Sequence, residues 1–202
     1  MKEWLSQYGY LLLVFVAVCI GAAVIFYFAV RAYSKHNALY KAQETEMKRL
    51  LALKEKYMDF TEETLASADE KEILEGVALS YQLRLQKEEN PEKAFELLGE
   101  EKKKLYVLDV FCADGDVKVF FSENGKIVKE KIIPALTMIG MEDFAIKLKD
   151  VYDMYDEANE EISYSENKIE KMNEYISDND ILSKIKSEGA KYIKNNFSAV
   201  KN

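Results

Sequence analysis

The sequence predicts an all-α chain with a single N-terminal transmembrane helix, a helical stalk and a compact multi-helix acidic domain. Three observations favour this fold class. A long apolar run near the N-terminus has no charged residue, apolar residues recur at helical spacing through most of the remainder, and only 2 prolines interrupt the chain. We place the transmembrane anchor at residues 1–33, the stalk or linker at 34–66 and the acidic domain at 67–202.

The predicted span is the apolar run from Leu11 to Val30, which at about 1.5 Å per residue crosses a hydrocarbon core of roughly 30 Å. A cleaved signal peptide is the alternative, but the run is longer than the usual apolar segment and Arg31 follows without a small-residue cleavage site. Aromatic residues, which favour the membrane interface, lie near both ends: Trp4, Tyr8, Tyr10, Tyr27 and Tyr33.

Basic residues beside the span predict its orientation, because they resist translocation. Lys2, next to Glu3, is the one basic residue on the N-terminal side, whereas Arg31, Lys35 and Lys41 follow the span. We therefore expect a single-pass protein of the cell membrane with its C-terminal domain in the cytosol.

The formal net charge of -8 is distributed unevenly. Residues 31–57 carry seven Lys or Arg against three Glu, a balance of +4, and residues 58–202 carry twenty against thirty-two acidic residues, a balance of -12. Anionic lipid would attract the first segment. The acidic domain lacks the basic face that phosphate binding needs, so direct nucleic-acid binding is not expected, which leaves solubility or a basic protein partner as the role of the charge.

The first predicted elements are helices. The stalk, His36 to Phe60, has too few heptads for a coiled coil, but its apolar residues recur near helical spacing: Met47, Leu50, Leu51, Leu53 and Tyr57. Ser67 to Glu70 (SADE) fits a capping box before a helix with one apolar face, formed by Leu74, Val77, Tyr81 and Leu85. Asn90-Pro91 ends that helix and starts another, with proline in its permitted first position.

Three further helices are expected toward the C-terminus. A long amphipathic helix is indicated by apolar residues at steps of four, three, four and seven: Phe144, Leu148, Val151, Tyr155 and Ile162. A second is marked by Ile169, Met172 and Ile176, and a last one by Leu182, Ile185, Tyr192 and Ile193.

One stretch, Cys112 to Lys126 (CADGDVKVFFSENGK), has two incompatible interpretations. Asp-Gly and Asn-Gly are dipeptides that tight hairpins prefer, and Val117, Val119 and Phe121 alternate between them as in a half-buried strand. The same residues also fit short helices that end at glycine caps.

Residues around this stretch follow a characteristic order: an apolar helix, a glycine turn, an aromatic pair, a second glycine, and a helix ending in Ala-Leu-x-x-Ile-Gly. They are Phe111, Asp114, Gly115, Phe120, Phe121, Gly125, Ala135, Leu136, Ile139 and Gly140. The series resembles the core of the DNA-mimic protein family, small acidic all-helical proteins of bacteria. Tyr192 to Phe197 looks like the C-terminal helix of that family, and the resemblance covers roughly residues 78–200.

The resemblance implies that the stretch is helical. Leu105, Leu108 and Cys112 would then form one buried face, and Gly115 and Gly125 would be caps or corners with positive φ. The sequence departs from the family pattern where the usual Asn-Gly-Gly turn is Asp114-Gly115-Asp116 and where Lys118-Val119 replaces the polar residue before the aromatic pair. The hairpin stays open as the alternative.

The candidate partner-binding face lies in Asp150 to Glu161 (DVYDMYDEANEE), which has six carboxylates and no basic residue. On a continuous helix, residues three or four apart share a face, with neighbouring Cβ atoms about 5 to 6 Å apart. The residues expected on this acidic face are Asp150, Asp153, Asp156, Glu157, Glu160 and Glu161. A solvated helix face is the alternative interpretation.

No feature of the sequence points to catalysis, a metal or a cofactor. His36, the only histidine, adjoins the predicted membrane span, and Cys112 sits in an apolar run that indicates core. Asp114 and Asp116 suggest a calcium loop, but position twelve of such a loop would be Gly125 rather than glutamate.

The sequence thus leaves two hypotheses of function. The first is a membrane-tethered acidic interaction module. The family resemblance implies that this module is a DNA mimic, which occupies the DNA-binding face of a basic partner. The alternative is a structural scaffold that organises a membrane assembly through apolar contacts.

Overall fold

The computed structural model describes residues 40–153, 155–156, 161–162 and 166–201. The chain divides into two units, Met1–Leu51 and Ala52–Asn202. The described part of the first unit is helical, and this helix, called the N-terminal helix below, spans residues 40–57. The predicted anchor, residues 1–33, lies outside the described residues, and no described helix is long and apolar enough to cross a membrane.

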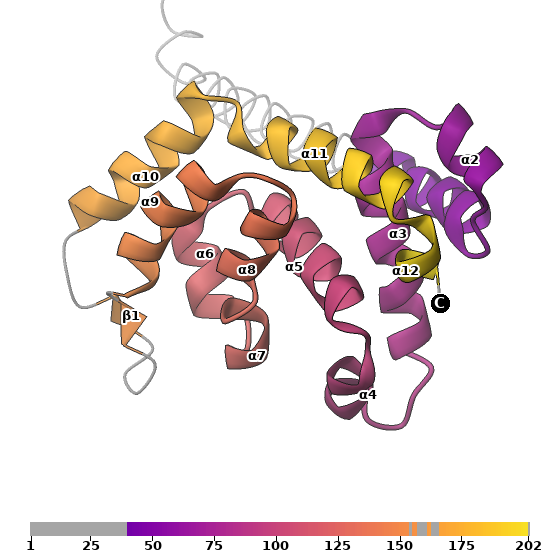
Figure 1. Ribbon diagram of the computed structural model, residues 1–202, viewed down its shortest axis with the longest axis horizontal. Coiled ribbons are helices and arrows are strands. Elements are labelled where there is room, and N and C mark those ends of the chain that lie inside the picture. The colour runs from indigo at the N-terminus through magenta and orange to yellow at the C-terminus, as the bar shows by residue number, and fades with distance from the viewer. Residues whose placement is uncertain (1–39, 154, 157–160, 163–165, 202) are drawn as a thin grey trace, which may run out of the picture. The chain divides into compact units, whose positions relative to one another are not determined.

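The second unit is built from short and medium helices, shown in Figure 1. In chain order the elements are α2 (Glu62–Ser67), α3 (Glu70–Leu85), α4 (Pro91–Leu97), α5 (Glu100–Asp114), α6 (Val117–Glu123), α7 (Lys126–Lys129), α8 (Ile132–Met138), α9 (Glu142–Tyr152), β1 (Tyr155–Asp156), β2 (Glu161–Ile162), α10 (Glu166–Asp178), α11 (Ile181–Asn195) and α12 (Phe197–Lys201). The predicted all-α class is confirmed for the described residues, where one antiparallel pair of two-residue strands is the sole exception.

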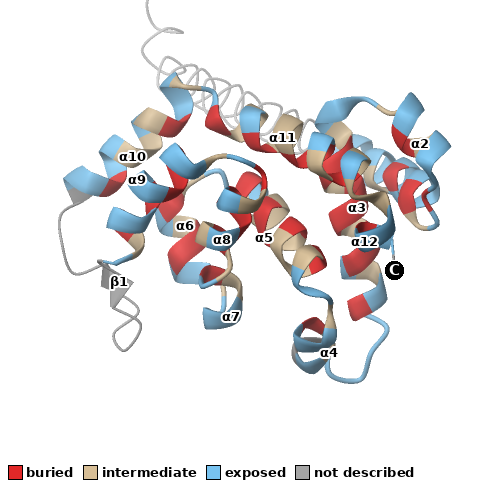
Figure 2. Cartoon of the chain, viewed as in Figure 1, coloured by how far each residue is buried: buried red, intermediate tan, exposed pale blue. Residues whose placement is uncertain are grey.

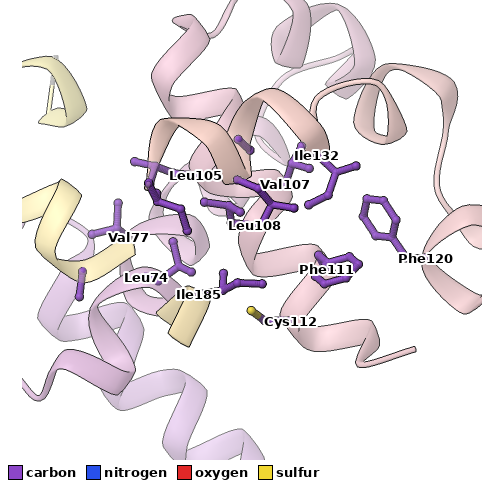
Figure 3. Packing of buried hydrophobic residues seen from close by; sticks show 14 of the residues in the cluster. Leu74, Val77, Leu105, Val107, Leu108, Phe111, Cys112, Phe120, Ile132 and Ile185 are labelled. Atoms are coloured by element: carbon purple, nitrogen blue, oxygen red, sulfur yellow. The ribbon is translucent and has the colours of Figure 1, made fainter. Parts of the chain in front are cut away.

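Three helices form the centre of the second unit. α11 packs on α3 and α5, α3 packs on α5, and α8 contacts both α5 and α9. The buried residues of α3, α5 and α11 lie on the faces that these helices turn toward one another (Figure 2). Their apolar side chains interdigitate, as seen for Leu74, Leu108 and Ile185 in Figure 3. The face predicted for α3 is buried throughout, whereas on α11 Ile185 and Ile193 are buried and Leu182 and Tyr192 are partly buried against the core.

The ambiguous stretch is helical, so the hairpin alternative is wrong. α5 ends at Asp114, and its C-cap Gly115 has a left-handed φ of 65° and donates its amide to the Phe111 carbonyl at 3.2 Å. α6 then starts at Val117, with Asp116 as its N-cap. The predicted buried face of α5 is confirmed, since Leu105, Leu108 and Cys112 all lie in the core.

The second predicted positive φ is wrong. Gly125 has a φ of -67° because it precedes α7 as its N-cap, a position that takes extended backbone. The left-handed glycine is instead Gly140, with a φ of 79°. It ends α8, where the amide of Met141 donates to the carbonyl of Leu136 at 2.9 Å, the pattern of a Schellman cap.

The aromatic pair of the family-like series is part of the core. Phe120 and Phe121 are fully buried, and Ile139 is buried too. Phe120 meets Phe111 of α5 edge-to-face at 5.2 Å between ring centroids, and Phe121 lies 5.7 Å from Tyr152 of α9. These residues hold α6 between α5 and α9.

The second unit extends further toward the N-terminus than the predicted domain boundary at residue 67. It begins at Ala52. Four apolar residues from the segment assigned to the stalk are buried in its core: Leu53, Tyr57, Phe60 and Leu65. Residues 52–66 therefore belong to the compact unit.

The predicted capping box at Ser67 is wrong. Ser67 is the last residue of α2, and its hydroxyl donates to the carbonyls of Glu63 and Thr64, so Asp69 caps α3 instead. A reciprocal box does occur one helix earlier, where Thr61 and Thr64 bond each other's amides at the start of α2. The predicted Asn90-Pro91 start of α4 is confirmed, with the Asn90 side chain accepting from the Lys93 amide.

Candidate interaction surfaces

The described members of the predicted acidic face, Asp150, Asp153, Asp156 and Glu161, do not lie on one helix. α9 ends at Tyr152, with Asp153 as its C-cap. Asp156 lies on β1 opposite Glu161 on β2. Asp150 is exposed on α9 and Glu157 and Glu160 lie outside the described residues, so the structure does not bring the six together.

Electrostatics explains why the predicted long helix stops. Carboxylates three or four residues apart repel each other on a helix, and negative charge near a helix C-terminus opposes the helix dipole. Lys149 forms a favourable pair with Asp153, at 2.5 Å, and this pair lies where α9 ends. Tyr155 and Ile162, which seemed to continue the helical period, are instead partners across the strand pair.

A different acidic surface lies on α10. Glu170, Glu174 and Asp178 recur at steps of four and are all exposed, while Ile169 and Ile176 on the opposite side are buried. At about 1.5 Å of rise per residue, successive carboxylates are about 6 Å apart along the axis. We call these three residues the α10 acidic row. The four-residue spacing of these carboxylates is visible in the sequence. The apolar residues of the same segment, however, predicted only a helix that packs on the core.

α10 is fixed to the rest of the domain by a side-chain pair that includes the family-like turn. Asn173 donates to the Asp116 carboxylate at 2.6 Å and accepts from the buried amide of Val117 at 3.0 Å. The other Asp116 oxygen accepts from the amides of Lys118 and Val119. Asp116 therefore caps α6 and positions α10 at once.

The neighbouring turn residue, Asp114, also has a structural role. Its carboxylate accepts a hydrogen bond of 2.8 Å from Asn124, which donates in addition to the Phe120 carbonyl. Burial raises the pKa of Asp114, and the bond from Asn124 acts against that rise. The bond between Asp114 and Asn124 thus joins the last residue of α5 to the C-cap of α6.

An apolar groove lies beside α4. It has a volume of about 570 Å³ and is lined by four apolar residues, Leu85, Ala94, Leu97 and Leu98, and by five polar ones: Arg84, Glu88, Glu89, Asn90 and Lys93. Leu97 is 87 % exposed, the largest fraction among the exposed large apolar side chains of the described residues. Uncovered apolar side chains with a polar rim are typical of a protein contact surface. We call this the α4 groove.

A smaller hollow of about 300 Å³ lies between α9 and α10. Lys147, Lys168 and Lys171 surround it, and the ammonium of Lys147 lies 4.7 Å from the centre of the Tyr175 ring. Lys168 and Lys171 belong to α10 and Lys147 to α9, and Asp150 of α9 also lines the hollow.

In the described part of the chain, no cluster of three or more His, Cys, Asp or Glu side chains could hold a metal ion. Cys112 is buried, and burial raises the pKa of its thiol to about 12. The thiol is therefore neutral at physiological pH and makes a weak contact of 3.8 Å with the Leu182 carbonyl. His36 lies outside the described residues.

Comparison of the chain with protein-family models, with curated proteins and with solved structures finds no match. A hypothesis of function therefore rests on the chain's own residues.

Proposed function

We propose that this chain is a protein-interaction module, held at the membrane by residues 1–33, whose cytosolic domain binds a basic protein partner through the α10 acidic row. The observation that carries the proposal is the row itself, in a segment (residues 58–202) with a balance of -12. Three exposed carboxylates on one rigid, well-anchored helix offer a fixed series of negative charges. Basic side chains of a partner would meet them without reorganisation of the helix.

DNA mimicry is the more specific form of this proposal. A DNA-binding protein places Lys and Arg against a regular series of phosphates, and these contacts supply much of its affinity. A regular series of carboxylates can occupy the same basic face. The resemblance of the Phe111 to Gly140 series to the DNA-mimic family supports this form of the proposal.

The experiment replaces the row by neutral residues, in the triple variant Glu170→Gln, Glu174→Gln, Asp178→Asn. A partner captured from native membranes is purified, and its dissociation constant is measured for both chains across a salt series. Each exposed ion pair contributes about 0.2–1 kcal/mol, so the variant should bind roughly tenfold more weakly and with a shallower salt dependence. Duplex DNA should compete with the unaltered chain for the partner.

A matched control removes three exposed carboxylates elsewhere, as Glu62→Gln, Glu63→Gln, Glu96→Gln. Its net charge equals that of the row variant. Equal weakening in both variants would show that only net charge matters, and binding that ignores salt would contradict the proposal altogether.

The scaffold hypothesis is the second candidate, and the α4 groove favours it. Burying Leu97 and the other apolar residues of the groove against an apolar partner surface would produce binding that resists salt. Leu97→Glu should then abolish capture of the partner. Ile146→Glu, at a side chain 66 % exposed on α9, is the matched control and should leave capture intact. If the two substitutions act alike, the α4 groove has no special role.

A further inference from the structure

The N-terminal helix carries two separate apolar stripes. Leu53 and Tyr57 are buried in the core of the second unit. Tyr40, Met47 and Leu51 are exposed by 62 %, 59 % and 51 %. The core therefore accounts for one stripe and leaves the other, which we call the stalk stripe, without a partner among the described residues.

Helical geometry separates the two stripes clearly. Residues seven and eleven positions apart differ in direction by about 20° at 100° per residue, so the members of the stalk stripe lie within about 40° of one another. By the same rule, Tyr57 and Leu53 lie about 100° and 140° round the helix from the centre of the stalk stripe. Three large apolar residues in so narrow an arc form a seam of the kind through which helices pair.

The charges beside the stalk stripe permit a second copy of the same helix to approach. Lys48 pairs with Glu44 and Arg49 with Glu46, each at 2.7 Å, within one helix. The five charged residues from 40 to 51 are three basic and two acidic, so two copies would meet with little net repulsion.

The predicted membrane span sets the orientation of such a pair. Its apolar run ends at Val30, ten residues before Tyr40. Two copies in one bilayer therefore leave it parallel and at the same height, which places each stripe residue opposite its counterpart. Three side chains make a contact far smaller than a standard interface, so pairing depends on the high local concentration that a shared membrane provides.

We propose that the stalk stripe is the contact between two copies of this chain, paired in parallel through Tyr40, Met47 and Leu51. The inference rests on the membrane anchoring in the proposed function and is independent of the α10 partner.

Cysteine crosslinking of the full chain in lipid vesicles tests the pairing. In a Cys19→Ala background, with Cys112 left in the core, single cysteines are placed on the stripe (Met47→Cys, Leu51→Cys) and away from it on exposed positions of the same helix (Thr45→Cys, Ala52→Cys). A disulfide needs Cα atoms within about 7 Å, so stripe positions should crosslink at least about tenfold faster than the controls. Equal rates at all four positions, or no crosslinking at the stripe, would overturn the pairing.

A second set of variants tests whether apolar contact drives the pairing. With Tyr40→Cys as reporter, Leu51→Glu should suppress crosslinking and Met47→Leu should preserve it. Diluting the chain with lipid should lower the crosslinked fraction. If neither substitution suppresses crosslinking, or if both suppress it equally, the stalk stripe is not the contact.

Flotation of the vesicles separates the two proposals. A chain that floats but fails to crosslink at the stripe overturns the pairing alone. A chain that does not float overturns the anchoring and the pairing together. In either case, partner binding through α10 is tested separately, by the affinity of the variant that lacks the α10 acidic row.

Discussion

Tyr57 packs so closely on Gly76 that position 76 has no room for a methyl group. A Cβ there would lie 2.3 Å from Cδ2 of the tyrosine ring. The ring is fully buried and its hydroxyl donates to Glu72 at 3.2 Å, so it cannot move aside easily. This contact holds the segment before α2 against α3.

The first prediction is that the effect of Gly76→Ala on stability changes sign when the Tyr57 ring is removed. Gly76→Ala should destabilise the protein by about 1–3 kcal/mol through overpacking, measured by chemical denaturation. In a Tyr57→Ala background the same substitution should stabilise it by about 0.5–1 kcal/mol, because alanine favours the helix. A cost that persists in that background would mean that something other than the tyrosine fills the space.

Glu100 gives a prediction about pH. Hydrogen bonds from Lys131 at 2.7 Å and Lys103 at 2.9 Å lower the pKa of its carboxyl from an ordinary 4.5 to about 2. A lowered pKa stabilises the fold above the ordinary value, and that stability is lost as pH falls from 4.5 toward 2. Glu100→Gln should therefore flatten the pH dependence of the unfolding free energy in this window.

The size of that effect should be small, because the Glu100 side chain is 56 % exposed and water screens the pair. Lys131→Met removes the main hydrogen-bond donor and should flatten the same window. If the lysine variant keeps the full acid dependence, the link between α5 and α8 is not its source.

At the scale of elements, the Asn173 link decides where α10 sits. Asn173→Ala leaves the amide of Val117 buried without an acceptor, which costs about 1–3 kcal/mol. Amide exchange at Val117 should accelerate together with the loss of stability. Asn167→Ala, at an exposed position of the same helix, should change stability by less than about 0.5 kcal/mol. Unchanged exchange at Val117 would contradict the role assigned to Asn173.

The helices that the sequence predicted well are those whose burial follows one simple period. Leu74, Val77, Tyr81 and Leu85 recur at steps of three and four and are all buried on α3, because a helix face against a core is a local property. The end of α9 did not follow from the sequence, because Tyr155 and Ile162 continue its apolar period although they pair across two short strands.

The placement of the candidate surface could not be predicted in the same way. Asp116 and Asn173 are 57 residues apart, and a single hydrogen-bonded pair leaves no periodic signal in the chain. The sequence pattern does not separate the two stripes of the N-terminal helix, because Leu51 and Leu53 are near neighbours along the chain and fit one helical series. Only the fold shows which of them faces the core.

At the scale of the whole molecule, the boundary at Ala52 predicts which fragments fold. A fragment of residues 52–202 should unfold cooperatively. A fragment of residues 67–202 loses four buried side chains, worth about 1.5–3 kcal/mol each, against a total stability of about 5–15 kcal/mol for a domain. Near-ultraviolet circular dichroism and denaturant titration compare the two fragments. A shorter fragment as stable as the longer one would refute the assignment of residues 52–66 to the core.

The Tyr81 hydroxyl donates to the Val200 carbonyl at 2.7 Å, although the two residues are 119 positions apart in the chain. This contact has a consequence for biosynthesis. Ribosomes deliver the N-terminus first, so α3 and α5 emerge before the helices that cover them. Ile185 and Ile193 of α11 and Val200 of α12 are made well after α3 and α5, and all three are fully buried. Until they arrive, the apolar faces of the earlier helices stay open to chaperones and to other nascent chains. The domain therefore completes its fold only after α12 has left the ribosome, well after its N-terminal segment has done so.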